Sequence, residues 1–137
     1  MTHKEATLYC DGASSGNPGA SGVGVVLICG DKTYEISENI GTATNNIAEY
    51  SALVKGLSKA RSLNIEKVHI FLDSELLVRQ VEGTYKVKSE NLKKLYENVI
   101  SQLKFFREYS IRHIPREQNK KADILAKRAV KTARESG

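Results

Sequence analysis

Apolar and polar positions along this 137-residue chain form blocks, and each block has the period of one kind of element. Compact apolar runs bounded by glycine, proline or polar residues are typical of buried strands. Such runs predict strands at residues 6–10, 21–30, 32–41, 67–72 and 108–114. Gly30 and Asp31, between the second and third runs, are a hairpin signal.

Between these runs the apolar positions recur every three to four residues, which predicts helices. The predicted helices cover residues 45–63, 74–83, 89–106 and 119–133. The first and third have the clearest apolar faces, made by Tyr50, Leu53, Val54, Leu57 and Ala60 and by Leu92, Leu95, Val99 and Leu103. The order β-β-β-α-β-α-α-β-α combines an antiparallel hairpin with parallel crossovers. We therefore expect an α/β fold, with helices on the faces of a mixed sheet.

Composition is that of an ordinary globular protein, with 40% apolar and 27% charged residues. We expect one domain over residues 1–137, with disordered ends at 1–4 and 134–137. No segment is long and apolar enough to span a bilayer, and the N-terminus lacks the apolar region of a signal peptide. Cys10 and Cys29 form no C-x-x-C pair and lie in apolar runs, which favours buried thiols in a reducing compartment and predicts a cytoplasmic location.

Four acidic residues stand near the predicted ends of strands or starts of helices: Asp11, Glu49, Asp73 and Asp123. Each has a local explanation. Asp11 could form an Asx-turn, Glu49 a capping box with Asn46, and Asp73 and Asp123 could stabilise helix N-termini. Ligand sites of open α/β sheets lie where strands end, however, and convergence of all four would make one acidic pocket.

An acidic pocket in a chain of net charge +5 suggests a cation inside and a polyanion outside. Mg²⁺ prefers a few carboxylates together with waters and substrate oxygens. Two such ions, about 3.5–4 Å apart, can activate a water and stabilise a leaving oxygen in phosphoryl transfer. His3, His69 and His113 are too scattered to indicate zinc.

Along nearly its whole length the chain resembles type 1 ribonuclease H. The strings that carry the resemblance are "DGASSGNPG", "TNNIAEY", the pair Asp73-Ser74 and "HIPREQNKKAD". The resemblance implies a ribonuclease H-like fold with a five-stranded mixed sheet, its first three strands antiparallel. It implies an enzyme that cleaves the RNA strand of RNA/DNA hybrids and leaves 5′-phosphate and 3′-hydroxyl ends. Two Mg²⁺ ions bound with the substrate, Mn²⁺ as a substitute, and a monomer are implied as well.

The same resemblance assigns the metal-binding carboxylates to Asp11, Glu49, Asp73 and Asp123. Asp11 would bridge both ions, Asp123 would help to hold the ion that activates water, and Glu49 and Asp73 the ion at the leaving oxygen. His113, in a loop after the last strand, would assist proton transfer or product release. The residues implied in substrate binding are Gly12, Ala13, Asn17, Thr44, Asn45, Asn46, Ser74, Glu75 and Asn119.

Two features depart from the family pattern. Glu75 stands where many members have glutamine, and a negative charge there weakens or retunes a minor-groove contact. The segment 83–89 is all that corresponds to the basic, tryptophan-bearing handle of many bacterial members. Nearby lysines either replace part of that handle through phosphate contacts or form an ordinary solvated face: Lys86, Lys88, Lys93 and Lys94.

Two other functions stay open on the sequence alone. A non-catalytic module could bind hybrids or double-stranded RNA with the same fold, although such a module has little reason to keep four carboxylates. A DNA-directed nuclease of integrase or resolvase type would share the scattered carboxylates. It would lack the "TNN" and "GNPG" segments expected to meet a strand with 2′-hydroxyl groups.

Overall fold

The computed structural model describes residues 4–136, with side chains as far as Ala133. Its elements, in chain order, are β1 (Glu5–Ser14), β2 (Gly19–Cys29), β3 (Lys32–Ala43), α1 (Asn45–Ser62), β4 (Lys67–Leu72), α2 (Glu75–Glu82), α3 (Glu90–Leu103), β5 (Glu108–His113), the 3-10 turn η1 (Arg116–Gln118) and α4 (Lys120–Ser136). The ends predicted to be disordered are residues 1–4 and 134–137. Of these only Lys4 has a described side chain, so this expectation stays a prediction.

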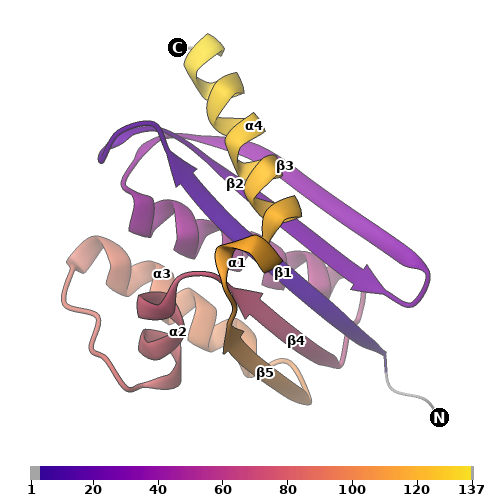
Figure 1. Ribbon diagram of the computed structural model, residues 1–137. Coiled ribbons are helices and arrows are strands. Elements are labelled where there is room, and N and C mark those ends of the chain that lie inside the picture. The colour runs from indigo at the N-terminus through magenta and orange to yellow at the C-terminus, as the bar shows by residue number, and fades with distance from the viewer. Residues whose placement is uncertain (1–3, 137) are drawn as a thin grey trace.

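The five strands form one sheet in the order β3-β2-β1-β4-β5 (Figure 1). Strand β2 pairs antiparallel with β1 and β3, whereas β4 pairs parallel with β1 and β5. The predicted mixed sheet, with its first three strands antiparallel, is confirmed. β1 is the central strand, and because it runs parallel to β4, the last residue of β4, Leu72, lies opposite Cys10.

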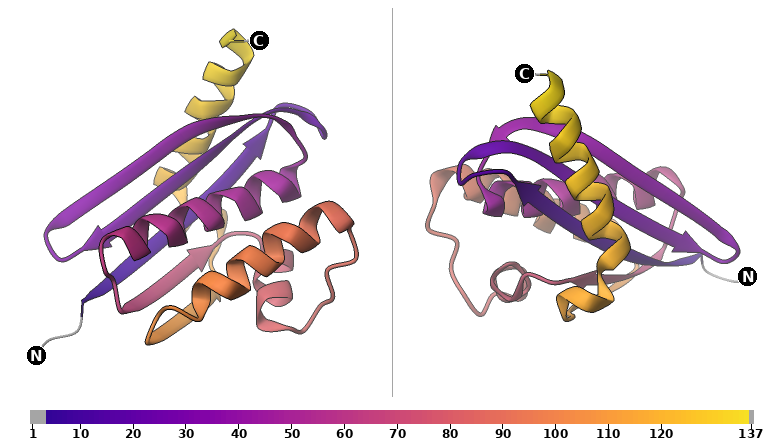
Figure 2. Two further views of the ribbon diagram at one scale, coloured as in Figure 1. Left: turned by 180° about the vertical axis from the view of Figure 1, so that it is seen from behind. Right: turned by 45° about the horizontal axis from the view of Figure 1, so that its top comes forward.

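Helices cover both faces of the sheet (Figures 1 and 2). α1 packs on β1 and β2 with α3 beside it, and α4 crosses the opposite face over β1, β2 and β3. The short helix α2 lies against β5. Between residues 4 and 136 no helix has the length and apolar character needed to cross a bilayer.

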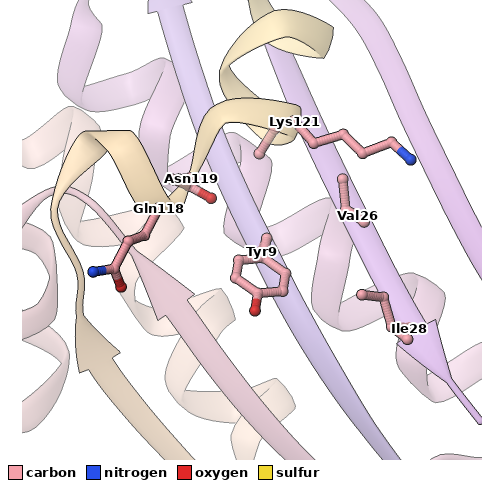
Figure 3. A pocket seen from close by; sticks show the side chains of 7 residues that line it. Tyr9, Val26, Ile28, Gln118, Asn119 and Lys121 are labelled. Atoms are coloured by element: carbon pink, nitrogen blue, oxygen red, sulfur yellow. The ribbon is translucent and has the colours of Figure 1, made fainter.

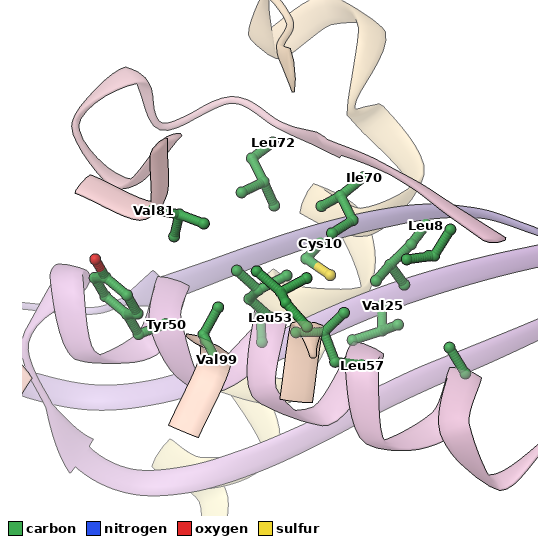
Figure 4. Packing of buried hydrophobic residues seen from close by; sticks show 14 of the residues in the cluster. Leu8, Cys10, Val25, Tyr50, Leu53, Leu57, Ile70, Leu72, Val81 and Val99 are labelled. Carbon is green, nitrogen blue, oxygen red and sulfur yellow. The ribbon is translucent and has the colours of Figure 1, made fainter. Parts of the chain in front are cut away.

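The main core lies between the sheet and the α1–α3 layer (Figure 4). Leu8, Val25 and Ile70 from three adjacent strands meet Leu53 and Leu57 from α1, and all five are inaccessible to solvent. Each such side chain contributes about 1.5–3 kcal/mol on burial, so this layer fixes α1 on β1. The predicted apolar faces of the first and third long helices are confirmed, with Val54 and Leu95 only partly buried.

The first strand is longer than the predicted 6–10. The string "DGASS" has the glycine and small residues of a turn, yet β1 stays paired with β2 as far as Ser14 opposite Ser21. The turn itself is confined to residues 15–18. The hairpin at Gly30 and the end of α2 at Gly83 are confirmed, and both glycines have positive φ.

Candidate active site

Asp11 lies inside β1 and is the most buried of the four carboxylates. Its side chain is 5% exposed, and its Cα partner on β2 is Gly24. Because the backbone of Asp11 is extended and paired, the Asx-turn explanation is wrong. The strand holds this carboxylate at the centre of the sheet, where only its neighbours or a ligand can compensate its charge.

Glu49 reaches Asp11 from α1. The helix begins after Thr44, whose hydroxyl accepts a hydrogen bond from the Ile47 amide at 3.2 Å, so a capping box between Asn46 and Glu49 is wrong. Gly12 permits the close approach, since a Cβ there would lie 2.2–2.4 Å from backbone atoms of Ala48 and Glu49. The structure thus explains the glycine at position 12 by its packing against α1, whereas the resemblance implies a role for Gly12 in substrate binding.

Asp73 directly follows β4, and Ser74 is the N-cap of α2. The Ser74 hydroxyl accepts a hydrogen bond from the Leu77 amide at 3.2 Å and also interacts with Glu49. The serine therefore caps the helix, and the Asp73 carboxylate is not needed for that purpose. Asp11, Glu49 and Asp73 line one small cavity, as predicted from the neighbouring strand ends.

Asp123 approaches from the other face of the sheet, in the first turn of α4. Gly24 makes this possible, because a Cβ at this position would lie 2.0 Å from the Ala122 carbonyl oxygen. The Asp123 carboxylate forms an ion pair with Lys127 one turn later, with 3.0 Å between Oδ2 and Nζ. Helix α4 thus supplies both the fourth carboxylate and the lysine ammonium group that pairs with it.

The four carboxylates interact electrostatically, which confirms that the fold brings them together. Burial raises the pKa of Asp11 to about 8, with further contributions from the charge of Asp73, a hydrogen bond to Asp123, and the charges of Asp123 and Glu49. Burial also raises the pKa of Glu49, although Ser74 opposes the shift. For Asp123 the effect of partial burial is outweighed by Lys127 and the hydrogen bond to Asp11, so its pKa is lowered.

Asn119 connects the segments that carry these carboxylates. It is 1% exposed, and its Nδ2 donates to the Cys10 carbonyl oxygen and to Asp73 Oδ2, both at 2.9 Å. Cys10 precedes Asp11 on β1, so one amide joins β1, the end of β4 and the turn before α4. We expected Asn119 to contact substrate, and the structure instead places it inside the protein as a support for Asp73.

The donor set fits a hard divalent cation. In the described part of the chain no three His, Cys, Asp or Glu side chains are grouped so that they could hold a metal ion in a protein cage. Mg²⁺ does not need such a cage, since it commonly binds one or two carboxylates and completes its shell with waters and phosphate oxygens. The raised pKa of Asp11 is a property of this site that a bound cation would relieve, because a positive charge there favours the ionised carboxyl.

His113 is the last residue of β5, as the predicted strand 108–114 has it, and is not in the loop where the resemblance placed it. It pairs in register with Leu72, which precedes Asp73, so its exposed ring stands at the same end of the sheet as the carboxylates. Arg116 in η1 was missed by the sequence reasoning. Its charge opposes the rise in the pKa of Glu49 and helps to lower the pKa of Asp123. The only sequence signal was a basic residue shortly before Asp123.

The remaining predicted substrate residues surround the N-terminus of α1. The side-chain oxygen of Asn17 accepts a hydrogen bond from the Asn45 amide at 3.1 Å and so links the β1–β2 turn to this helix end. Asn45 and Asn46 are exposed, whereas the Thr44 hydroxyl is engaged in capping.

On the other side of the site, Glu75 pairs with Arg79 at 3.0 Å, which partly compensates the unusual charge. Ala13 is half-buried in β1.

Residues 9–129 match the model of the reverse transcriptase-like family. Over 135 residues the chain is 38% identical to the bifunctional protein Rv2228c of Mycobacterium tuberculosis, covering 96% of this chain and 37% of that protein. It is 39% identical to ribonuclease HI of Halobacterium salinarum over 91% of this chain and 64% of the relative. It is also 34% identical to ribonuclease H of Chlorobium phaeobacteroides, over 96% of this chain and 99% of the relative. The chain belongs to the ribonuclease H family.

Solved structures agree with this assignment to the ribonuclease H family. The structure of LC11-RNase H1 in complex with an RNA/DNA hybrid superposes with a TM-score of 0.87 at 37% identity, covering 93% of this chain and 98% of the other. The N-terminal RNase H domain of the Mycobacterium tuberculosis protein gives a TM-score of 0.89, covering 92% and 98%. The ribonuclease H-like fold predicted from the sequence is confirmed. The chain nevertheless spans only 37–64% of the length of the first curated relatives that it matches.

Proposed function

We propose that this chain is a ribonuclease H that hydrolyses the RNA strand of RNA/DNA hybrids. The observation that carries the proposal is the meeting of four carboxylates from β1, α1, β4 and α4 around the buried Asp11. A protein that only bound nucleic acid would gain nothing from this cluster, because it repels phosphates and raises the pKa of Asp11. The named relatives and the hybrid-bound neighbour support the same conclusion.

Asp11, Glu49, Asp73 and Asp123 are the residues that would hold the metal. Two divalent ions bound with the substrate would supply an activated water and stabilise the leaving oxygen, which gives 5′-phosphate and 3′-hydroxyl ends. Asn119 keeps the Asp73 carboxylate in a fixed orientation through its amide. Ser74 does the same for Glu49.

His113 has the position and chemistry of a proton carrier. It is exposed at the end of β5, beside the strand that leads into Asp73. An imidazole nitrogen can accept or donate a proton, which suits transfer to the leaving group or help in product release. Exposed amides of Asn45 and Asn46 suit contacts with a minor groove, because an amide both donates and accepts hydrogen bonds.

The test is cleavage of matched RNA/DNA, RNA/RNA and DNA/DNA duplexes with Mg²⁺, Mn²⁺ or EDTA. We expect cleavage of the hybrid's RNA strand alone, dependent on metal, with products that carry a 5′-phosphate. Asp11→Asn should reduce the rate at least about a thousandfold, because it removes the central carboxylate. Asp31→Asn makes the same chemical change in the exposed β2–β3 turn and should leave the rate unchanged.

Three outcomes would overturn the proposal. Affinity for the hybrid without cleavage in either metal would favour the binding module. Cleavage of duplex DNA would favour the DNA-directed nuclease. Full activity in EDTA would exclude the metal-dependent mechanism. The monomeric state, the reducing compartment and the cytoplasmic location stay predictions. Of the two thiols expected to be buried, Cys10 is buried and Cys29 only partly so.

A further inference from the structure

A second pocket lies on the α4 side of the sheet and is separate from the acidic cavity. Its volume is about 240 Å³. The walls come from β1, β2 and the start of α4 (Figure 3), and the lining residues used below are Tyr9, Val26, Ile28, Asn119, Lys121 and Ala122. None of the four carboxylates lines it. Asn119 is the one link, since its amide nitrogen faces Asp73 while its side chain also lines the pocket.

The Asn119 carbonyl oxygen is a buried acceptor without a partner among the described residues. Its orientation is fixed by chemistry, because the amide nitrogen must face its two acceptors, the Cys10 carbonyl and the Asp73 carboxylate. The oxygen therefore points away from the carboxylates, toward the pocket (Figure 3). A buried carbonyl oxygen that lacks a donor is unfavourable, and a ligand with a hydrogen-bond donor would relieve this.

Apart from the Gln118 side chain, the other walls are mostly apolar. The Tyr9 ring stacks on Phe71 with 5.4 Å between centroids, so its orientation is supported from the neighbouring strand. Val26 and Ile28 form the β2 wall. The Lys121 ammonium is already paired with Glu35 at 2.7 Å, which leaves the methylene chain of Lys121 to face the pocket. These walls suit a planar molecule with apolar faces and do not suit an anionic group.

We propose that this pocket binds a free nucleoside whose base carries an exocyclic amino group. The base would stack on Tyr9 between the β2 side chains and the start of α4, and its amino group would donate to Asn119 Oδ1. The polar edges of the base and the ribose would stay at the open mouth of the pocket. The proposal goes beyond the nuclease function and does not depend on it, because the site needs neither metal nor hybrid.

The test compares two nucleosides that differ only in the amino group. Adenosine and purine riboside are titrated into metal-free, ¹⁵N-labelled protein, and the amide resonances are followed by NMR. We expect adenosine to shift the side-chain amide of Asn119 and the backbone amides of Val26 and Ile28. We also expect adenosine to bind at least fivefold more tightly than purine riboside, through the bond to Asn119.

Two variants at Tyr9 make the test specific. Tyr9→Phe keeps the stacking ring and should bind adenosine as the wild type does, whereas Tyr9→Ala should weaken binding at least fivefold. Val26→Phe should fill the pocket and abolish binding. Should Val26→Phe fail to fold, the Tyr9 pair alone decides. The proposal would be overturned if both nucleosides bound equally tightly or if adenosine did not bind. It would also be overturned if the resonance shifts were confined to the acidic cavity, or if neither Tyr9 variant changed the affinity for adenosine. A failed nuclease assay would not overturn it.

Discussion

The acidic site has an inner side at Asp11 and an outer side at Asp123, and the two carboxylates are held differently. On the inner side Asp11 is buried within β1, the central strand, and no ion pair holds it within the described part of the chain. On the outer side Asp123 is paired with Lys127. The pKa is raised at Asp11 and lowered at Asp123. The protein thus compensates the outer charge itself and leaves the inner one for a cation to compensate.

The largest effect is expected from a substitution that adds one methyl group between the sheet and α4 and so moves Asp123 away from Asp11. Gly24→Ala would place a Cβ 2.0 Å from the Ala122 carbonyl oxygen, and this contact is with backbone that cannot rotate away. We expect a loss of about 2–4 kcal/mol in the free energy of unfolding, measured in urea, as α4 is forced off the sheet. Asp123 would move with α4, so nuclease activity should fall as well.

Gly41→Ala is the control for this loss. It meets no atom within 4 Å but has a φ of +77°, so its cost comes from backbone conformation alone, about 1 kcal/mol. A Gly24→Ala protein as stable as Gly41→Ala would show that the close approach of α4 does not hold the outer side in place.

A smaller effect concerns the inner side alone. Asp11→Asn should stabilise the metal-free protein at pH 8 by about 1–3 kcal/mol, because it removes a buried charge that the protein does not compensate. The folded pKa, about 8, lies above the ordinary value of 3.8. The native state therefore retains a proton that the unfolded chain releases, and wild-type stability falls as pH rises from about 4 to 8. Urea unfolding of both proteins across this range should diverge with pH.

The outer side should respond with the opposite sign. The folded pKa of Asp123 is lowered, so its contribution to stability is present at neutral pH and is lost as pH falls through that value. Asp123→Asn should destabilise the metal-free protein by less than about 1 kcal/mol at pH 7. Stabilisation by both asparagine variants would show that the two sides are not different.

The smallest effect is expected at Lys127. Its side chain is 65% exposed, so Lys127→Met should change the free energy of unfolding by less than about 0.5 kcal/mol. The pKa of Asp123 should nevertheless rise, as followed by carboxyl ¹³C resonances in NMR. Lys93→Met breaks a similar exposed pair with Glu90 and should leave the Asp123 resonance unchanged.

The sequence predicted the elements and the helix layers on a mixed sheet well, because periodicity reports which positions face a core. It stopped β1 too early, since "DGASS" has turn composition and only its pairing with β2 makes it a strand. The cap of α1 was placed wrongly for a similar reason, because Thr44 and Asn46 are both good capping residues and the tertiary contacts decide between them.

Within the site, convergence of the four carboxylates was predictable and their support was not. The close approaches at Gly12 and Gly24 depend on how two helices pack, which no local pattern encodes. Asn119 is similar, since a polar residue in the basic segment before α4 is usually exposed and only its contacts reveal it as an interior support.

The hydrogen bond from Asn119 to Cys10 joins residues 109 positions apart. During synthesis, therefore, the strands and α1 emerge well before the segment that completes the site. A nascent chain that ends after β5 lacks Asp123, Lys127 and the Asn119 amide that orients Asp73. The acidic site is therefore complete only when the last helix has been made and has docked on the sheet.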